Sequence, residues 1–509
     1  MIARFWRNAP WWMAFGAAAL ALFDLQFSVV GRALTLGAIA IGLAGVLVAP
    51  WADALLLAIA MSLFPGDAWL LGVAPALLYR AARNRSLGFG RSLRSMLLVG
   101  FFISAAGSAL FGLIAIEARP LQWFVWMATL GAPLLLLGGA FPRLPNQIVP
   151  VLSRFLLSVL WLQVPVCIAQ LVRHGEPEPG DWFAGLWGDA NLVGLWGAAT
   201  MSVCAVRVLT GTAALKGPRA WVVGCGHFAA AAFLVWGASA KVYSASIFAA
   251  AGVVTVMLLI AGTGISRIGT VFRASVVTLA ILLTGVLAES WVRDNLEGFI
   301  SNWENSEKRT LLARMVFDVG QRYNSVLGVG PGMLASRAAS AASGDVLHKE
   351  TEGMFAKLLA PAPKPERWAM YGLWDAEVVQ SVTNKSAIVA MPFSGWGSLR
   401  GELGWPAVFL LTFYLLSLGL QMASIAARHP GARSIGIAAA IGCVGLLPML
   451  FFDNILEQPR IMGPLAILVI TARGVASGLD RASASVRPTA FERPADHSRP
   501  HSSPPRGLL

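Results

Sequence analysis

Cationic side chains and closely spaced glycines occur together in one polar stretch of this chain, residues 309–332. Arg309 and Arg314 lie in a segment with helical spacing, and a Gly-Val-Gly-Pro-Gly run follows at Gly328, Gly330 and Gly332. Guanidinium groups bind phosphate oxygens through paired hydrogen bonds, and glycines let the backbone approach a ligand closely. These residue types suit an anionic, phosphate-bearing ligand, although the same glycines equally suit a plain surface turn.

The two arginines are not equivalent candidates. Arg309 and Arg314 are five positions apart, so on a helix they do not share a face. The spacing to Gly328 favours Arg309 as the residue that acts in the site. Arg314 is the second substrate-binding candidate, and its alternative is an ion pair with a surface carboxylate such as Glu304 or Asp318.

Lys241 is a third cation that could meet the same kind of ligand. It stands at the start of an apolar run, in a short connection that carries no other charge. Its ammonium group there could bind a substrate diphosphate. The competing interpretation is ordinary contact with lipid headgroups, and chemistry alone does not separate the two.

The composition indicates that these residues belong to a membrane protein. Hydrophobic residues make up 57% of the chain and charged residues 13%, and the mean hydropathy is +0.67. This profile excludes an ordinary soluble domain and predicts an all-α, polytopic bundle of transmembrane helices. The net charge of +13 does not predict nucleic-acid binding, because the basic residues cluster in short segments between apolar runs, as they do in cytoplasmic loops.

Apolar runs predict about 12–14 membrane spans. The stretch 51–79 is the least certain, since Phe64-Pro-Gly-Asp67 divides it into two short pieces that could also form one kinked span. The arginine-rich and lysine-rich segments between the apolar runs all fall on one side of the membrane only when 51–79 is counted as two spans. That count predicts cytoplasmic termini and an extracytoplasmic loop of mixed charge, partly helical, at about 291–400.

Four regions follow from this pattern in a multi-pass membrane protein, which in a bacterium would lie in the inner membrane. The divisions are an N-terminal transmembrane bundle at 1–290, an extracytoplasmic (periplasmic) loop with the candidate site at 291–400, C-terminal spans at 401–475, and a cytoplasmic tail at 476–509. The tail is rich in Arg, Pro and Ser without hydrophobic periodicity, which predicts disorder.

Three motifs of this chain resemble motifs of the O-antigen polymerase and ligase family of bacterial membrane proteins (Wzy-like and WaaL-like). Members of that family tend to have an arginine early in the large periplasmic loop followed by a turn like Leu327-Gly-Val-Gly-Pro-Gly332. They also tend to have a Ser-Arg pair where this chain has Gly237-Ala-Ser-Ala-Lys-Val-Tyr243, and a Glu-x-Gly motif similar to Leu399-Arg-Gly-Glu-Leu-Gly404. The resemblance makes Glu402 a substrate-binding candidate.

The chain departs from that family at the expected general base. The family pattern implies a His-Asn pair about nine residues before Glu402, where this sequence has Phe393-Ser394. His348 is the substitute candidate, because it is the histidine of the loop and its ordinary pKa lies near neutrality. An inert, exposed histidine is the alternative. Four carboxylates remain as other candidate bases: Glu350, Glu352, Asp375 and Glu377.

The resemblance implies glycosyl transfer from an undecaprenyl diphosphate-linked oligosaccharide on the periplasmic face, with membrane lipid around the site. A repeat-unit polymerase is the first expectation, and a ligase that transfers the glycan to lipid A core or protein is the second. A polysaccharide transporter or flippase is a further alternative, from a different functional class. A flippase and a chain-length regulator are the implied protein partners. We expect no cofactor and no metal, since the loop offers no metal-ligand cluster and lacks an Asp-x-Asp motif.

Overall fold

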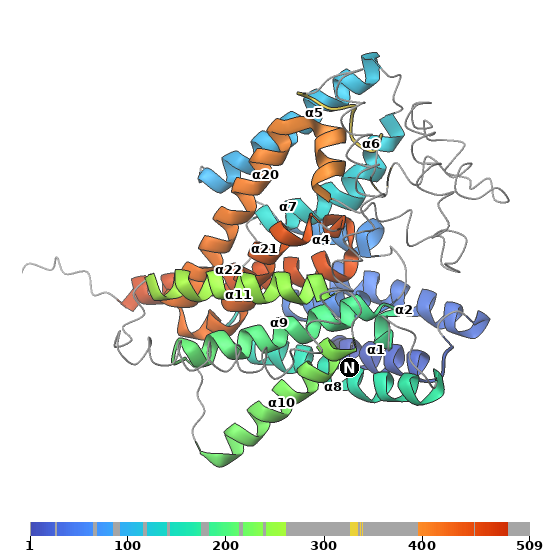
Figure 1. Ribbon diagram of the computed structural model, residues 1–509, viewed down its shortest axis with the longest axis vertical. Helices are drawn as coiled ribbons and strands as arrows, with labels where there is room; N and C mark the ends of the chain where they lie inside the picture. The colour runs from blue at the N-terminus through green and yellow to red at the C-terminus, as the bar shows by residue number, and fades with distance from the viewer. Residues whose placement is uncertain are drawn as a thin grey trace, which may run out of the picture.

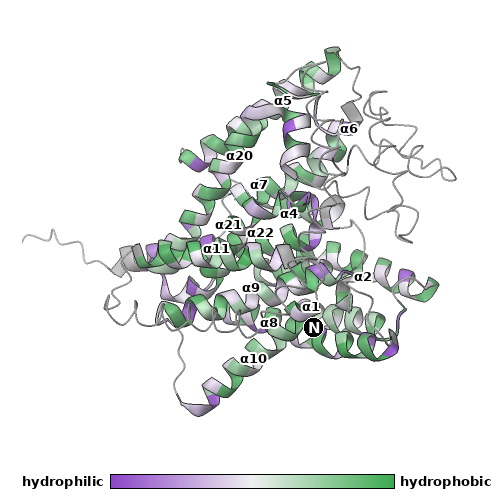
Figure 2. Cartoon of the chain, in the orientation of Figure 1, coloured by the Kyte–Doolittle hydropathy of each residue, from purple (hydrophilic) through white to green (hydrophobic). Residues whose placement is uncertain are grey.

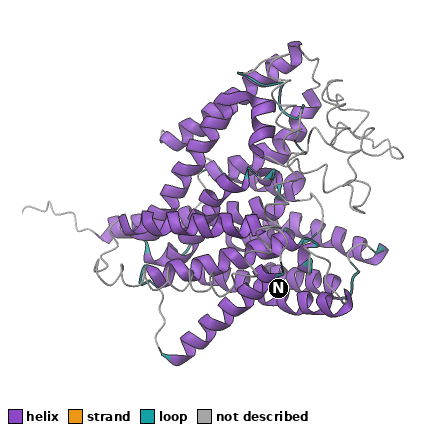
Figure 3. Cartoon of the chain, viewed as in Figure 1, coloured by secondary structure: helices purple, strands orange, loops and turns teal. Residues whose placement is uncertain are grey.

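The computed structural model is helical throughout the part of the chain that it describes (Figures 1 and 3). Those residues are 2–25, 28–64, 69–84, 92–115, 120–139, 143–174, 183–212, 217–237, 241–260, 326–333, 336, 338, 395–451 and 453–486. Residues 261–290 at the end of the predicted N-terminal bundle and most of the predicted loop at 291–400 lie outside them. The candidates Arg309, Arg314 and His348 are therefore not described.

The N-terminal half consists of helices joined by short connections. They are α1 (Ile2–Leu22), α2 (Val29–Val48), α3 (Trp51–Met61), the π-helical η1 (Trp69–Val73), α4 (Ala74–Arg83), α5 (Leu93–Ala115), α6 (Pro120–Trp126), the π-helical η2 (Met127–Gly131), α7 (Ala132–Gly138), α8 (Ile148–His174), η3 (Gly185–Trp187), α9 (Ala190–Leu209), α10 (Pro218–Trp236) and α11 (Lys241–Ile260).

The C-terminal part adds three long helices with short 3₁₀ turns between them. They are α20 (Gly395–Arg428), η4 (Pro430–Ala432), α21 (Arg433–Met449), η5 (Ile455–Glu457) and α22 (Pro459–Val486). Helix α20 packs on α21 and on α5, while α9 packs on both α10 and α11. These contacts join the two halves of the chain into one bundle.

Eight of the described helices are long and apolar enough to cross a membrane, judged by length and composition. They are Val29–Val48, Leu93–Ala115, Ile148–Arg173, Ala190–Leu209, Pro218–Trp236, Gly395–Arg428, Pro430–Met449 and Pro459–Asp480. Three shorter apolar helices, Trp51–Met61, Gln122–Gly138 and Tyr243–Leu259, accompany them. An all-α, polytopic helical bundle is therefore confirmed.

The long helices consist mainly of hydrophobic residues (Figure 2), and many large apolar side chains are exposed on them. Phe409 and Phe413 of α20 are exposed, and so are Ile103 and Ile114 of α5. A soluble protein seldom exposes so many large apolar side chains. These side chains indicate contact with acyl chains.

The uncertain stretch 51–79 forms two short helices that run back on each other. The Arg80 guanidinium donates to the carbonyl oxygens of Val46, at 2.7 Å, and Ala49, at 2.5 Å, and lies over the Trp51 ring at 4.4 Å. The indole nitrogen of Trp69 donates to the Ala58 carbonyl oxygen at 2.9 Å. Both ends of the stretch thus lie together, so it is not one kinked span.

The described helices have two chemically different ends. We call one the turn end, because it holds the glycine turn at 326–333 and the loop 450–457. We call the other the basic end, because α9, α20, α21 and α22 bring Arg207, Arg428, Arg433 and Arg473 toward it. The topology predicted from the sequence likewise puts Arg207, Arg428 and Arg433 on one side of the membrane and Asp453 and Glu457 on the other.

Candidate functional site

The glycine turn has a backbone that side-chain-bearing residues rarely adopt. Gly328, Gly330 and Gly332 have φ of +74°, +110° and +75°. Between them Val329 is fully buried. The Gly-Val-Gly-Pro-Gly run is thus a tightly packed turn and not the exposed surface turn that the sequence left open.

The turn docks on a kink in α20 that the sequence of that helix explains. Gly404 has φ 76° and ψ −178°, which interrupts the helix. In a regular helix the Glu402 carbonyl would accept from residue 406, but Pro406 has no N–H. The freed carbonyls of Gly401 and Glu402 instead accept the N–H groups of Val329, at 3.0 Å, and Gly330, at 2.9 Å.

The Glu402 side chain completes this docking. Its Oε2 accepts the Gly332 N–H at 2.9 Å, and the residue is 2% exposed. The Glu402 carbonyl also accepts the Ser108 hydroxyl. One residue of α20 therefore fixes the glycine turn through both its backbone and its carboxylate, and ties α5 to the same point.

Helices α5 and α6 enclose the other side of the turn. Gly112 of α5 lies so close that a Cβ built there would be 2.6 Å from the Val329 carbonyl oxygen. The Gln122 amide nitrogen of α6 donates to the Gly332 carbonyl oxygen, while its Oε1 is buried without a hydrogen-bond partner in the described part of the chain. The short turn lies between α5 and α6 in Figure 1.

Lys241 lies at this same end, as the first residue of α11. Two residues later the Tyr243 hydroxyl donates to Asp453 Oδ2 at 2.5 Å. The Asp453 backbone oxygen in turn accepts the N–H of Gly395, the first residue of α20, at 3.1 Å. Asp453 thus connects the helix that begins with Lys241 to the helix that carries Glu402.

A second buried carboxylate stands beside this connection. Glu457 is fully buried; its Oε2 accepts the Asn454 amide at 2.7 Å and its Oε1 accepts the Thr129 hydroxyl at 3.4 Å. Thr129 belongs to η2, which continues directly from α6 and Gln122. The α6–η2 segment therefore borders both buried carboxylates, one through Gly332 and the other directly.

The turn end also holds a cation, Arg400, that lies within the Leu399–Gly404 motif and was not predicted as a site residue. Arg400 is partly exposed, two residues before Glu402, and its guanidinium lies over the Trp405 ring at 4.6 Å. A cation over an indole ring is held in place while its N–H groups stay available. Arg400 thus adds a positive charge next to the docked turn.

The structure brings together Gly328, Gly330, Gly332 and Glu402, and it puts the start of α11 at the same end. It does not describe Arg309, Arg314, His348 or the alternative carboxylates Glu350, Glu352, Asp375 and Glu377. In the described ranges, no group of three or more His, Cys, Asp or Glu side chains could hold a metal ion.

Sequence reasoning missed the residues of α5 and α6 that hold the turn. Ser104, Ser108 and Gly112 recur at four-residue spacing in α5. Small residues at that spacing let another backbone approach a helix closely. That pattern is the signal that could have located the contact, whereas nothing in the sequence around Gln122 marks it.

Comparisons with models of protein families, with characterised proteins and with solved structures find no match to this chain. The fold and the geometry of the turn end therefore carry the functional argument.

Proposed function

We propose that this chain polymerises lipid-linked polysaccharide repeat units, of O-antigen, capsule or exopolysaccharide type, by glycosyl transfer. A hydroxyl of the acceptor sugar attacks the anomeric carbon of a glycan carried on undecaprenyl diphosphate. The bond from that carbon to the diphosphate oxygen breaks, the lipid diphosphate departs, and the hydroxyl proton passes to a base. Cations stabilise the charge that develops on the departing diphosphate.

The observation that carries this proposal is the docking of the glycine turn on Glu402. Three N–H groups of the turn donate to α20, two to backbone carbonyls and one to the Glu402 carboxylate, which makes the turn a firmly held end of the segment that begins with Arg309. A rigid base of this kind suits a residue that must hold a diphosphate in one geometry. The cation Arg400 at the same end supports the proposal further.

In this mechanism the cations and the base have separate roles. Arg309 binds the diphosphate in bidentate fashion, and Lys241 neutralises the second phosphate group. His348 accepts the proton of the attacking hydroxyl, with the loop carboxylates as the alternative bases. Glu402 orients the glycine turn, so its contribution to substrate binding is made through Gly332. No metal or cofactor is part of the proposal.

In this proposal the protein lies in the inner membrane of a bacterium, with the turn end in the periplasm and both termini in the cytoplasm. The positive-inside rule supports that orientation, since the basic end gathers arginines. A flippase and a chain-length regulator would then work beside it, supplying the repeat units and setting the length of the product.

Two other functions remain as alternatives. A ligase that transfers the glycan to lipid A core or protein uses the same donor and needs the same cations, so the acceptor alone separates it from a polymerase. A polysaccharide transporter or flippase would need a polar path through the membrane. The polar interval at 291–400 favours an enzyme over that class.

Reconstitution tests the proposed reaction. The purified full chain, given undecaprenyl diphosphate-linked repeat units in EDTA, is expected to make longer glycans. Transfer to lipid A core without chain extension would identify the ligase instead. Strict dependence on Mg²⁺ or Mn²⁺, or turnover of a sugar nucleotide alone, would exclude the proposed chemistry.

Variants of the loop test the roles within it. Arg309→Ala is expected to slow turnover at least about tenfold, since a charge-assisted contact contributes about 1.5–3 kcal/mol, and Arg309→Lys to restore part of the rate. Arg314→Ala is the matched control with a smaller effect. His348→Ala is expected to lower the extension rate by about 10²–10⁴-fold with donor binding intact. Normal turnover in Arg309→Ala or His348→Ala would remove that residue from the mechanism.

A further inference from the structure

An exposed row of aromatic side chains runs along α20, starting beside the glycine turn. Trp405, Phe409 and Phe413 are 42%, 55% and 57% exposed. They recur every four residues, so they lie on one face of the helix and cover about 12 Å of its length. The rings of Trp405 and Phe409 stack, with centroids 5.6 Å apart and planes 23° apart. We call these three residues the aromatic row.

The kink in α20 puts the start of the aromatic row directly beside the docked turn. Residues 401–404 are buried, and exposure begins at Trp405, the first residue after the kink. The Val326 carbonyl oxygen lies so close to Gly404 that a Cβ there would overlap it. From this point the row continues toward the basic end on a helix that packs on α5 (Figure 1).

A cation stands at the turn end of the aromatic row. The Arg400 guanidinium lies over the Trp405 ring, 4.6 Å from its centroid. Arg400 makes no hydrogen bond or ion pair with any residue that the structure describes. A guanidinium held over an indole ring keeps its N–H groups available for phosphate oxygens. The exposed face of α20 therefore has a cationic head and an apolar body.

The charge and shape of this face match an amphiphile with an anionic head. A ligand that joins a diphosphate to a long apolar chain would put its charge at Arg400 and its chain along the aromatic row. Aromatic side chains offer large apolar contact areas. The row lies on a span-length helix, so such a chain reaches it from the bilayer and needs no enclosed cavity. One cation and one row suit one chain, whereas a phospholipid carries two.

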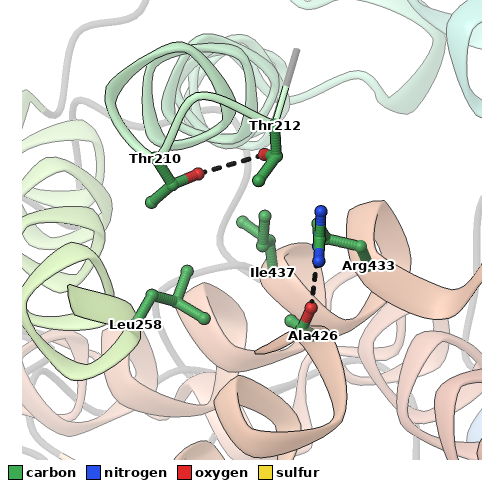
Figure 4. A pocket seen from close by; sticks show the side chains of 6 residues that line it. All are labelled: Thr210, Thr212, Leu258, Ala426, Arg433 and Ile437. Atoms are coloured by element: carbon green, nitrogen blue, oxygen red, sulfur yellow. Dashed lines mark hydrogen bonds between the residues drawn. The ribbon is translucent and has the colours of Figure 1, made fainter. Parts of the chain in front are cut away.

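The hollow at the basic end offers no comparable place for an anion (Figure 4). It has no room for a water molecule, and its Arg433 Nε is bound to the Ala426 carbonyl oxygen at 3.0 Å. Helices α9, α11 and α20 end there, and carboxyl-terminal helix ends carry partial negative charge. The lining residues are Thr210, Thr212, Leu258, Ala426, Arg433 and Ile437. An anionic head group is therefore better matched at the turn end.

We propose that the aromatic row binds the first isoprene units of the donor's polyprenyl chain, while Arg400 binds an oxygen of its diphosphate. The inference rests on the proposed function for the identity of the ligand. Holding the chain and the head group together fixes the position of the diphosphate beside the glycine turn, where the glycan is to react. The row thus acts as the lipid subsite of the proposed enzyme.

Native mass spectrometry of the full chain in neutral detergent tests the aromatic row, with undecaprenyl diphosphate and inorganic diphosphate as probes. The double variant Phe409→Leu/Phe413→Leu stays apolar but loses two rings, and it is expected to bind undecaprenyl diphosphate about five- to tenfold more weakly. Its matched control is Phe15→Leu/Phe228→Leu, which removes two exposed rings from α1 and α10. Equal affinities of the two double variants for undecaprenyl diphosphate would overturn the proposal.

Variants of Arg400 separate the head of the ligand from its chain. Arg400→Gln is expected to weaken the binding of both probes about fivefold or more, and Arg400→Lys to weaken it less. Phe409→Leu/Phe413→Leu is expected to leave the binding of inorganic diphosphate unchanged. Wild-type affinity of Arg400→Gln for undecaprenyl diphosphate would overturn the proposal. Phosphatidylglycerol bound as tightly as undecaprenyl diphosphate would show a general lipid surface and contradict it.

Stability and turnover complete the test. Should the double variant be poorly folded, Phe413→Leu alone replaces it, with an expected two- to threefold loss of affinity, and wild-type affinity there would overturn the row. A chain that binds undecaprenyl diphosphate through the row but extends no glycan would support this inference and contradict the proposed reaction. Glycan extension with an unchanged donor KM in Phe409→Leu/Phe413→Leu would support the reaction and overturn the row.

Discussion

The Glu402 carboxylate accepts the Gly332 N–H at 2.9 Å across 70 residues of chain, within a site that is almost closed to solvent. The same residue accepts Gly330 with its carbonyl oxygen, because Pro406 leaves that carbonyl without its helical donor. A carboxylate bonded to a buried N–H is a strong contact whose loss leaves the N–H unsatisfied. Glu402 is thus the central anchor of the glycine turn.

Replacing Glu402 separates its charge from its shape. Glu402→Ala is expected to lower the free energy of unfolding by about 1–3 kcal/mol and to abolish most turnover, since the buried N–H loses its acceptor. Glu402→Gln keeps an acceptor oxygen and is expected to lose less of both. Thermal unfolding and glycan extension measure the two effects, with Asp480→Asn at the basic end as control. Full activity in Glu402→Ala would show that the turn needs no anchor.

Two glycines of α5 give a matched test of how closely the glycine turn approaches that helix. Gly112→Ala puts a Cβ 2.6 Å from the Val329 carbonyl oxygen, so the turn must move; Gly107→Ala meets nothing within 4 Å. Alanine is the better helix former by about 1 kcal/mol, so Gly107→Ala is expected to be neutral or stabilising. Gly112→Ala is expected to be destabilising and to reduce turnover. Thermal unfolding and activity are measured for the two purified variants. Equal stability and equal activity of the two would contradict the close contact of Gly112 with the Val329 carbonyl oxygen.

Composition was enough to predict the fold class, because a membrane span needs a long apolar helix and the sequence shows those runs directly. The two short helices at 51–83 needed the structure, since their pairing depends on Arg80 reaching the end of α2. The end of the first helix also needed the structure: α1 ends at Leu22, and Asp24 follows with φ of 55°, in the left-handed region that a helix cannot continue through.

Some residues of the candidate site could be predicted from the sequence, and others could not. The glycines at 328–332 and Glu402 were identified as separate motifs, and the structure joins them through backbone hydrogen bonds. The partners Ser108 and Gln122 were missed, because ordinary small and polar residues in apolar helices carry no chemical signature. Their role depends on which helix passes beside the turn, and that is a property of the tertiary packing.

The two ends of the bundle are expected to face opposite sides of the membrane. In a chain with its four cysteines replaced, Val326→Cys reports the turn end and Asp480→Cys the basic end; both positions are exposed. A membrane-impermeant thiol reagent added to intact cells is expected to label position 326, and position 480 only after the membrane is permeabilised. The reverse pattern would invert the orientation, and labelling of both would refute the opposite placement.

The Tyr243–Asp453 hydrogen bond is expected to hold Lys241 in position for the substrate. The hydroxyl donates to a carboxylate at 2.5 Å, and such charge-assisted bonds contribute about 1.5–3 kcal/mol. Tyr243→Phe and Asp453→Asn are each expected to be destabilising, and the double variant to lose less than the sum of the two. A purely structural bond would leave KM for the lipid-linked donor unchanged. A positioning role raises that KM in Tyr243→Phe, while Lys241→Arg, which keeps the charge at the start of α11, retains most of the affinity. Additive stability losses would mean that the two side chains do not interact, and an unchanged donor KM in Tyr243→Phe would remove the link to Lys241.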